Sequence, residues 1–537
     1  MDIDSAALNK PVSRDQSTPA QTPGAAADPT RRVTNAADPS GPFSGGRPDS
    51  VVSPEPGGQS EPVSDARSDS ADCAGSRPSP PSSQDSADDA ATLVSAAQLI
   101  AAEPGWSMAP RTPAVQRRPG LQPGPAARLD QNVPALLVRL DWNPAHHATL
   151  GVIRSLGRAG VPVHAILEHS RVPSARSRYL AGGHPWLDPE AEPARLIDRL
   201  CRLAERIGGQ PVLFPMDDAG ALLLAAHGAP LTEFARFPAV GAGVPARVAD
   251  KEQLAELCRQ AGVGYPETLV PTNAEEVAAA VAELGLPLIA KWSRPWLLRR
   301  GSGLKSTTLI TRAADAEKLF ARGAEAGCSL LLQRQIPATP GGDRFFHGYF
   351  TRAAGTGGAV GALGAGPVAC RFGATGRKDL AWPRSAGLTA RGTWLPDPEI
   401  EAAACLVVEA AGFTGVVDLD FRFDPETGQY ALLDFNPRLG AQFRLFTDPA
   451  GLDLPRAVHL DLSGRPIPPT SARPGRQLSV ESYDPLGGLR PFGEVERAWY
   501  AKDDPAPFPV AVFGAAARLA HRTRPGFRSS IQEGNAL

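Results

Sequence analysis

Two neighbouring segments in the C-terminal half of the chain constrain its fold more than any others. In GVVDLDFRF, apolar side chains alternate with Asp418 and Asp420, which predicts a strand with one buried face and one charged face. The turn sequence DPETG follows, and QYALLDFNPRLG then returns with Asp434 and Asn436 at alternate positions. Cross-strand neighbours in a hairpin share a face. We therefore expect these four polar side chains to converge on one side of a β-hairpin.

Three carboxylates on adjacent strands repel one another unless a cation lies between them. Oxygen ligands of this kind suit Mg²⁺ or Mn²⁺, and Mg²⁺ usually completes its coordination with phosphate oxygens. Arg438 follows Asn436 by two residues and is suited to a phosphoryl group. Between them, Pro437 ends the strand where the cation is expected to lie. The hairpin thus indicates a nucleotide held through a divalent cation.

Two lysines upstream are candidates for contacts to the other phosphates. Lys291 ends the apolar strand PLIAK, and Lys305 begins the next strand after the Gly- and Arg-rich loop RPWLLRRGSG. A glycine-bearing loop can fold its backbone N–H groups over a triphosphate. The loop is not a Walker motif, because GLKS has no adjacent Gly-Lys and no GxxxxG precedes it. Either lysine alone can equally be a surface charge, but together with the acidic hairpin they indicate a phosphate site.

Strands alternate with helices between residues 133 and 228, which predicts parallel βαβ units. In such sheets, ligands bind at the carboxyl ends of the strands. The polar residues that follow predicted strands are therefore candidates for substrate contact, although an aspartate at a helix start is often only a cap. These candidates are Asn143, His146, His147, Asp217 and Asp218.

The first 130 residues differ in composition from the rest of the chain. They are rich in Pro, Ser, Gly, Asp and Ala and contain only two aromatic residues, so we expect a disordered tail. One short helix within residues 88–106 is an alternative that allows docking on a partner or on the body of the protein.

The remaining composition excludes several classes of protein. A net charge of −2 and the absence of a Lys/Arg-rich run give no reason to expect nucleic acid or an anionic membrane as a partner. The start MDIDSAALNK does not resemble a secretory signal, and no apolar stretch approaches the roughly 20 residues that span a bilayer. The six scattered cysteines indicate reduced, mostly buried thiols. We therefore expect a cytoplasmic protein.

The order of motifs resembles the ATP-grasp superfamily, and within it the carboxylate–amine ligases of the D-aspartate ligase type. The motifs are LIAK, the glycine loop, LLLQRQIP, VDLDFRF and LLDFNPRLG, and the similarity runs from about residue 133 to 465. It implies an α/β fold in which two α+β subdomains clasp ATP after a parallel βαβ domain. The expected boundaries are a tail at 1–130, the βαβ domain at 131–245, the ATP-grasp domain at 246–465 with its lid at about 266–340, and a C-terminal extension at 466–537.

The resemblance also implies a role for each motif residue. Lysines hold the ATP phosphates, a hinge binds adenine through its backbone, two acids and an amide bind Mg²⁺, and an arginine lies near the transferred phosphate. Asp418 is a possible helper beside the metal ligands. The residues are Lys291 and Lys305 for phosphate, Gln333, Arg334, Gln335 and Ile336 for adenine, Asp420, Asp434 and Asn436 for Mg²⁺ or Mn²⁺, and Arg438 with Lys305 for catalysis.

The sequence departs from the family pattern at two places. Asp434 stands where the family usually has Glu, and the hinge QRQ lacks the acid often found there. Three further cations, Arg377, Lys378 and Arg444, can hold the substrate carboxylate or can equally be solvated surface groups.

The implied reaction joins a small carboxylate to an amine. ATP phosphorylates the carboxylate to an acyl phosphate, and the amine then displaces phosphate. One alternative is another ATP-grasp chemistry, such as a carboxylase or a purine-pathway ligase. A second alternative is a nucleotide-binding regulatory or scaffold protein whose tail recruits partners. A single sequence does not identify the two substrates or the oligomeric state.

Overall fold

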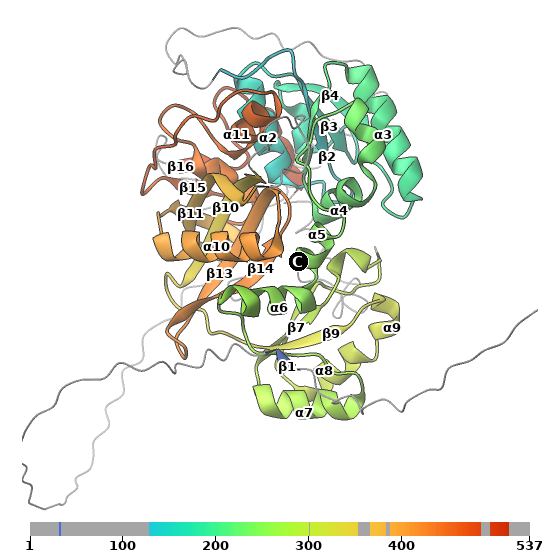
Figure 1. The fold of residues 1–537 in the computed structure, drawn as a ribbon, viewed down its shortest axis with the longest axis vertical. Helices are drawn as coiled ribbons and strands as arrows, with labels where there is room; N and C mark the ends of the chain where they lie inside the picture. The colour runs from blue at the N-terminus through green and yellow to red at the C-terminus, as the bar shows by residue number, and fades with distance from the viewer. Residues whose placement is uncertain are drawn as a thin grey trace, which may run out of the picture.

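The computed structural model describes residues 32–33, 128–299, 301–352, 366–382, 387–484 and 495–514. Most of the predicted tail, its short helix and the glycine run that starts at Gly355 therefore lie outside the described residues. The described residues form three β-sheets. In Figure 1 a parallel sheet lies at the top, the largest sheet lies below it, and a smaller sheet lies at the bottom.

The first sheet has the strand order β4-β3-β2-β5, and every pair in it is parallel, as predicted. Alternate residues of β2 face opposite sides, so Leu137 packs with α2 while Leu136 packs with α3 and α4. The elements are β2 (Ala135–Val138), α2 (His147–Arg158), β3 (Val163–Leu167), η2 (Pro173–Arg176), β4 (Leu180–Pro185), α3 (Pro193–Ile207), β5 (Val212–Pro215), α4 (Asp218–His227) and η3 (Ala229–Glu233).

A second region contains the five-stranded sheet β1-β6-β9-β7-β8, whose strands pair antiparallel. Helices α7 and α8 contribute to its separate hydrophobic core. β1 (Arg32–Val33) belongs to the segment predicted to be disordered, but it pairs with β6 at the edge of this sheet. The other elements are α5 (Val244–Ala249), α6 (Lys251–Ala261), β6 (Thr268–Leu269), α7 (Ala274–Leu284), β7 (Leu288–Trp292), η4 (Pro295–Leu297), β8 (Thr307–Ile310), α8 (Ala313–Phe320), α9 (Gly323–Ala326) and β9 (Leu330–Arg334).

The largest sheet has the order β14-β13-β10-β11-β12-β15-β16. Helices α6 and α10 cover one face, and α2, α11 and η5 cover the other. The final two strands come from the C-terminal extension. The elements are β10 (Asp343–Arg352), β11 (Val368–Trp382), β12 (Leu388–Trp394), α10 (Pro398–Ala411), β13 (Gly415–Asp424), β14 (Gln429–Asn436), η5 (Ala441–Phe446), α11 (Leu454–Leu462), β15 (Gln477–Ser479) and β16 (Val495–Arg497).

The sequence GRKD, with charged residues after a glycine, predicts an exposed basic turn, but the segment is instead part of β11. Its residues pair with β10 on one side and β12 on the other, so the backbone stays extended through the basic residues. The prediction was wrong because charge and one glycine suggested a loop, whereas cross-strand pairing decides the conformation.

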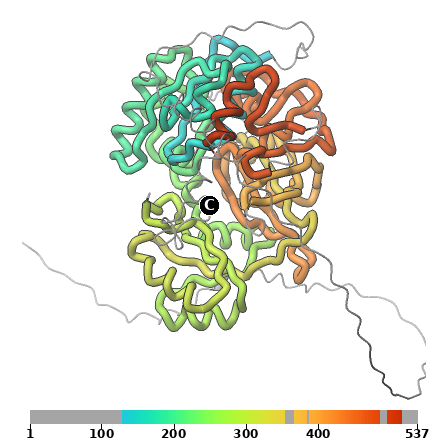
Figure 2. Tube along the Cα trace, turned by 180° about the vertical axis from the view of Figure 1, so that it is seen from behind, coloured from blue at the N-terminus to red at the C-terminus, as the bar shows by residue number. Residues whose placement is uncertain are grey.

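The C-terminal extension packs closely against the first sheet, as the red and cyan segments of Figure 2 show. Arg154 in α2 is buried; its Nε donates to Asp504 Oδ2 at 2.9 Å and its Nη2 donates to the carbonyl of Trp499 at 2.7 Å. Ser155 Oγ donates to Asp453 Oδ2 at 2.6 Å. The last described residues are therefore part of the body of the protein.

Two further predictions concern side chains and membranes. Of the described cysteines, all are free, but only Cys258 is buried and Cys370 is exposed, so the expectation of mostly buried thiols was wrong. Within the described residues, no helix is both long enough and apolar enough to cross a membrane.

Two histidines of the parallel sheet form a buried pair. His164 on β3 and His184 on β4 stack with their ring centroids 5.3 Å apart, and His164 Nδ1 lies 3.1 Å from His184 Nε2. Burial lowers the pKa of each imidazole to about 4. The folded protein thus disfavours the protonated form of both rings.

We predict that this pair makes stability fall in mild acid. In the unfolded chain these rings are protonated below about pH 6.5, whereas in the folded protein they are protonated only below about pH 4. The folded state is therefore destabilised relative to the unfolded state as the pH falls from about 6.5 to about 4. Urea unfolding is measured at pH 7 and at pH 4.5 to give the free energy of unfolding that is lost between them. This loss is expected to be about 3 kcal/mol smaller in the double variant His164→Gln, His184→Gln than in the wild type. The exposed His227→Gln is the control, and an equal loss in all three proteins contradicts the prediction.

Candidate active site

The polar residues of the acidic hairpin converge as predicted. In the pairing of β13 with β14, Asp420 lies opposite Asp434 and Asp418 lies opposite Asn436. On the other side of β13, His347 of β10 lies opposite Asp418 and is fully buried. Cross-strand partners share a face, so these five side chains form one polar row across three strands.

A β-bulge interrupts the hairpin beside this row. The register shifts after the Asp420–Asp434 pair, and Phe421 pairs with Leu432, which leaves Leu433 as the extra residue. The carbonyl of Leu433 accepts a hydrogen bond from Lys291 Nζ at 2.8 Å. Strict alternation had assigned Leu432 to the charged face, but the bulge puts it in the core.

Each of the two expected metal-binding acids has a lysine partner in the structure. Lys251, the first residue of α6, forms an ion pair with Asp434 and is 5% exposed. Lys378 Nζ lies 3.4 Å from Asp420 Oδ1. The sequence reasoning missed Lys251; its signal was the position of a lysine directly after the helix cap Asp250.

Burial and charge act in opposite directions on these groups. Burial raises the pKa of Asp420, and Lys378 only partly opposes this effect. Burial alone would also raise the pKa of Asp434, but Lys251 and Lys291 outweigh it and lower the pKa below its usual value. Asp434 is therefore held as a carboxylate, ready to bind a cation.

Arg438 joins the hairpin to the parallel sheet. Its Nη1 donates to Asp418 Oδ2 at 2.5 Å, and its Nε lies 3.6 Å from Asp218 Oδ1. Burial lowers the pKa of Arg438, but Asp418 and Asp218 more than compensate and raise it above its usual value. Asn436 Nδ2 donates to the backbone carbonyl of Asp418 at 3.1 Å.

The site is electrically balanced. Four carboxylates, those of Asp218, Asp418, Asp420 and Asp434, face four cations, those of Lys251, Lys291, Lys378 and Arg438.

The chain is similar to several known proteins. A curated D-aspartate ligase from Enterococcus faecium (strain Aus0004) is 24% identical over 279 residues, which is 49% of this chain. The match spans 62% of that ligase, less than two thirds of its length. No protein-family model matches the chain. This relative bears out the predicted resemblance to ligases of the D-aspartate ligase type.

Solved structures of low identity also resemble the chain. An ADP complex of N5-carboxyaminoimidazole synthetase from Staphylococcus aureus has a TM-score of 0.45 at 13% identity, covering 66% of this chain and 83% of that one. The biotin carboxylase domain of 2-oxoglutarate carboxylase from Hydrogenobacter thermophilus, with MgADP, has a TM-score of 0.44 at 13% identity, covering 64% and 73%.

The expected hinge, residues 333–336, connects the five-stranded sheet to the largest sheet. Gln333 is buried and its Nε2 donates to Thr268 Oγ1 at 2.9 Å, while Arg334 pairs with Asp424. The carbonyl of Ile336 accepts a hydrogen bond from Arg422 Nη1 at 3.2 Å. Gln335, the residue between Arg334 and Ile336, is half-buried. The side chains of Gln333 and Arg334 are thus engaged with protein groups. Their backbones pair with β7, and the carbonyl of Ile336 is taken by Arg422.

Lys305 is the one predicted phosphate ligand that the structure does not bring to the hairpin. It lies half-buried just before β8, in the five-stranded sheet, and contacts no acid within the described part of the chain. Lys291 is on the neighbouring strand β7, opposite Thr307.

The three candidate substrate cations lie in different environments. Lys378 belongs to the site through Asp420, whereas Arg377 is 39% exposed on its side chain and pairs with Asp379 at 2.7 Å. Arg444 is buried, and its Nη1 donates to the carbonyl of Ala498 at 2.9 Å. Arg444 therefore links parts of the fold, and its interpretation as a surface residue was wrong. A contact to the substrate carboxylate stays a prediction.

Among the candidates from the parallel sheet, Asp218 alone contacts the hairpin cluster in the described residues. Asp217 caps α4, and its Oδ2 also accepts from the backbone of Leu140 at 2.6 Å, so it fills the structural role of a cap. His147 is buried against Arg444, and His146 Nδ1 lies 2.8 Å from Thr149 Oγ1. Asn143 is exposed in the loop before α2.

The residues present fit a magnesium ion. No group of three or more His, Cys, Asp and Glu side chains suited to a metal occurs among the described residues. Two facing carboxylates and the amide of Asn436 are instead a sparse oxygen set, which matches an ion that takes its remaining ligands from water and phosphate.

We predict that Arg444 is needed for stability. Burial lowers its pKa to about 10, yet its guanidinium holds the carbonyls of Ala498 and His147. Replacing it with Met leaves those acceptors buried and unpaired, so the free energy of unfolding is expected to fall by about 2–4 kcal/mol in urea titrations. Arg377→Met is the matched control and is expected to change it by less than about 0.5 kcal/mol. Equal effects of the two substitutions contradict the structural role.

Proposed function

We propose that the protein is an ATP-dependent ligase that joins a small carboxylate to an amine through an acyl phosphate. One observation carries the proposal: the facing pair Asp420 and Asp434, with Asn436 beside it, lies among the buried cations Lys251 and Lys291 and the half-buried Arg438. A metal ion and a polyphosphate together replace the internal ion pairs of such a cluster. A surface hairpin has no reason to bury balanced charges in this way.

The chain's residues divide the work of phosphoryl transfer. Asp420, Asp434 and Asn436 would hold Mg²⁺, which neutralises charge on the transferring phosphoryl group. Lys251 and Lys291 would contact phosphate oxygens of a bound nucleotide, and Lys305 would reach the phosphates from the glycine loop. The hinge 333–336 would bind adenine through its backbone. The protein's contribution is positioning and electrostatic stabilisation.

The other half of the reaction uses the residues that face Arg438. With a cation bound at Asp420, Lys378 would be free to hold the substrate carboxylate next to the phosphoryl group. Asp218 lies 3.6 Å from Arg438, and burial raises its pKa, which suits a carboxylate that accepts a proton from the attacking amine. The amine attacks the acyl carbon, the C–O bond to phosphate breaks, and phosphate leaves.

The substrate is proposed only as a class. The relative named D-aspartate ligase favours an amino-acid carboxylate. A carboxylase or purine-type ligase would share the hairpin and differ in the carboxylate it activates. A regulatory nucleotide-binding protein would bind ATP without turnover. Because ATP and reduced thiols belong to the cytoplasm, we propose that the protein acts there on small molecules.

The first test uses the full chain with Mg²⁺-ATP, a panel of amino-acid and other small carboxylates, and hydroxylamine. Hydroxylamine traps acyl phosphates as hydroxamates, so the natural amine need not be known. We expect one carboxylate class to give hydroxamate and matching ADP, and Asp420→Asn to lose roughly 100-fold or more of both. Glu426→Gln, on the turn of the same hairpin, is expected to leave both unchanged. ATP binding without ADP or hydroxamate on the whole panel would favour the regulatory alternative.

The metal site has its own test. Mn²⁺ bound with ADP is measured by electron paramagnetic resonance, and Asp434→Asn is expected to weaken Mn²⁺ binding by roughly tenfold or more because one charged ligand is lost. Asp315→Asn, on the exposed helix α8, serves as the control. Unchanged Mn²⁺ affinity in Asp434→Asn would remove Asp434 from the ligand set.

A further inference from the structure

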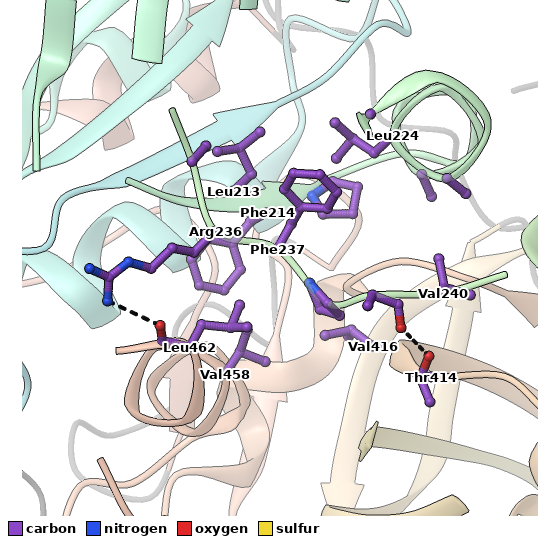
Figure 3. Close-up of a pocket in the computed structure, with 18 of the residues that line it drawn as sticks. Leu213, Phe214, Leu224, Arg236, Phe237, Val240, Thr414, Val416, Val458 and Leu462 are labelled. Carbon is purple, nitrogen blue, oxygen red and sulfur yellow. Dashed lines mark hydrogen bonds between the residues drawn. The ribbon is translucent and has the colours of Figure 1, made fainter. Parts of the chain in front are cut away.

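A cavity of about 700 Å³ lies between the parallel sheet and the largest sheet, apart from the hairpin cluster. Its walls come from β5, α4, the segment 235–240, the start of β13 and α11 (Figure 3). The lining is largely aliphatic and aromatic, and includes Leu213, Phe214, Leu224, Phe237, Val416 and Leu462. A cavity of this size and character is in the range that holds a small organic molecule.

One cation stands at the end of this apolar cavity. Arg236 lines it and is half-buried; its Nη1 donates to the carbonyl of Leu462 at 3.2 Å and its Nη2 to Gln210 Oε1 at 3.5 Å, as Figure 3 shows for the first contact. Within the described ranges, no carboxylate lies within ion-pair distance of it. A half-buried guanidinium beside apolar walls is better satisfied by an anion than by a single carbonyl and a long contact to an amide.

We propose that this cavity binds a small amphipathic carboxylate, with its apolar body against the lining and its carboxylate on Arg236. The two requirements come from different observations. The lining selects an apolar chain or ring, because filling an apolar cavity removes that surface from water. The uncompensated charge of Arg236 selects an anion over a neutral molecule of the same shape.

The cavity shares a strand end with the hairpin cluster. Pro437 and Leu439 line the cavity, while the intervening Arg438 faces Asp418 and Asp218. Gly415 and Val416 also line it and begin β13, the strand that carries the acids. A bound molecule therefore packs against the reverse side of the backbone that positions Arg438. The site is a second one, and its existence does not depend on the proposed ligase activity.

Isothermal titration of the full chain with dodecanoate, and with the neutral dodecanol as its matched partner, tests the proposal. We expect dodecanoate to bind with one site per chain and roughly tenfold or more tighter than dodecanol. Arg236→Gln is expected to remove that difference while leaving dodecanol unchanged. Ala225→Phe, which adds a ring to the cavity lining, is expected to weaken both ligands by tenfold or more.

Arg247→Gln is the control for a general loss of charge or stability. Arg247 also donates to a carbonyl at the end of a helix, that of Ala411 at 2.8 Å, but it does not line the cavity. The Arg247→Gln variant is expected to bind dodecanoate and dodecanol with the affinities of the wild type. Arg236→Lys, which keeps the charge, is expected to retain most of the preference for dodecanoate.

Three results would overturn the proposal. They are no binding of dodecanoate to the wild type, equal affinity for dodecanoate and dodecanol, and dodecanoate binding that is unchanged in both Arg236→Gln and Ala225→Phe. Thermal unfolding of each variant in the absence of ligand confirms that it is folded, and Arg236→Lys decides the role of charge if Arg236→Gln unfolds.

Discussion

The structure depends on a cluster of opposite charges in which Lys251, Lys291 and Asp418 are buried and the other members are half-buried. Unpaired carboxylates on adjacent strands would repel and would be costly to remove from water. Here a lysine opposes each of Asp420 and Asp434, and Arg438 opposes Asp418. These partners come from α6, β11 and the segment after β14, so three separate parts of the chain must meet at one point. The same balance leaves room for a metal ion and phosphate to exchange with internal partners.

Much of this could be predicted from the sequence. The alternation of apolar and polar residues was enough to bring Asp418, Asp420, Asp434 and Asn436 to one face of a hairpin, because cross-strand neighbours share a face. The alternation of strands and helices was also enough to predict the parallel sheet. These features are local, or depend on one short turn, and short-range patterns report them reliably.

The rest of the site depends on contacts that sequence patterns do not encode. The bulge at Leu433 changes which residues face the core, and nothing in QYALLDF marks it. Lys251 reaches Asp434 from 183 residues away, and His347 was hidden in an apolar strand. Arg444 looked like a free cation after the motif until its acceptors on Ala498 and His147 were seen. In each case tertiary packing, not local preference, decides the role.

The link between α2 and the end of the chain also has a consequence for synthesis on the ribosome. Ser155 binds Asp453, which is 298 residues later, and the core that covers one face of β2 is completed by α11. At about 5–20 residues per second, the ribosome needs roughly 15–60 s to supply that partner. During this interval α2 covers this face of the first sheet without the packing of α11. The nascent protein is therefore expected to rely on chaperones until its last hundred residues emerge.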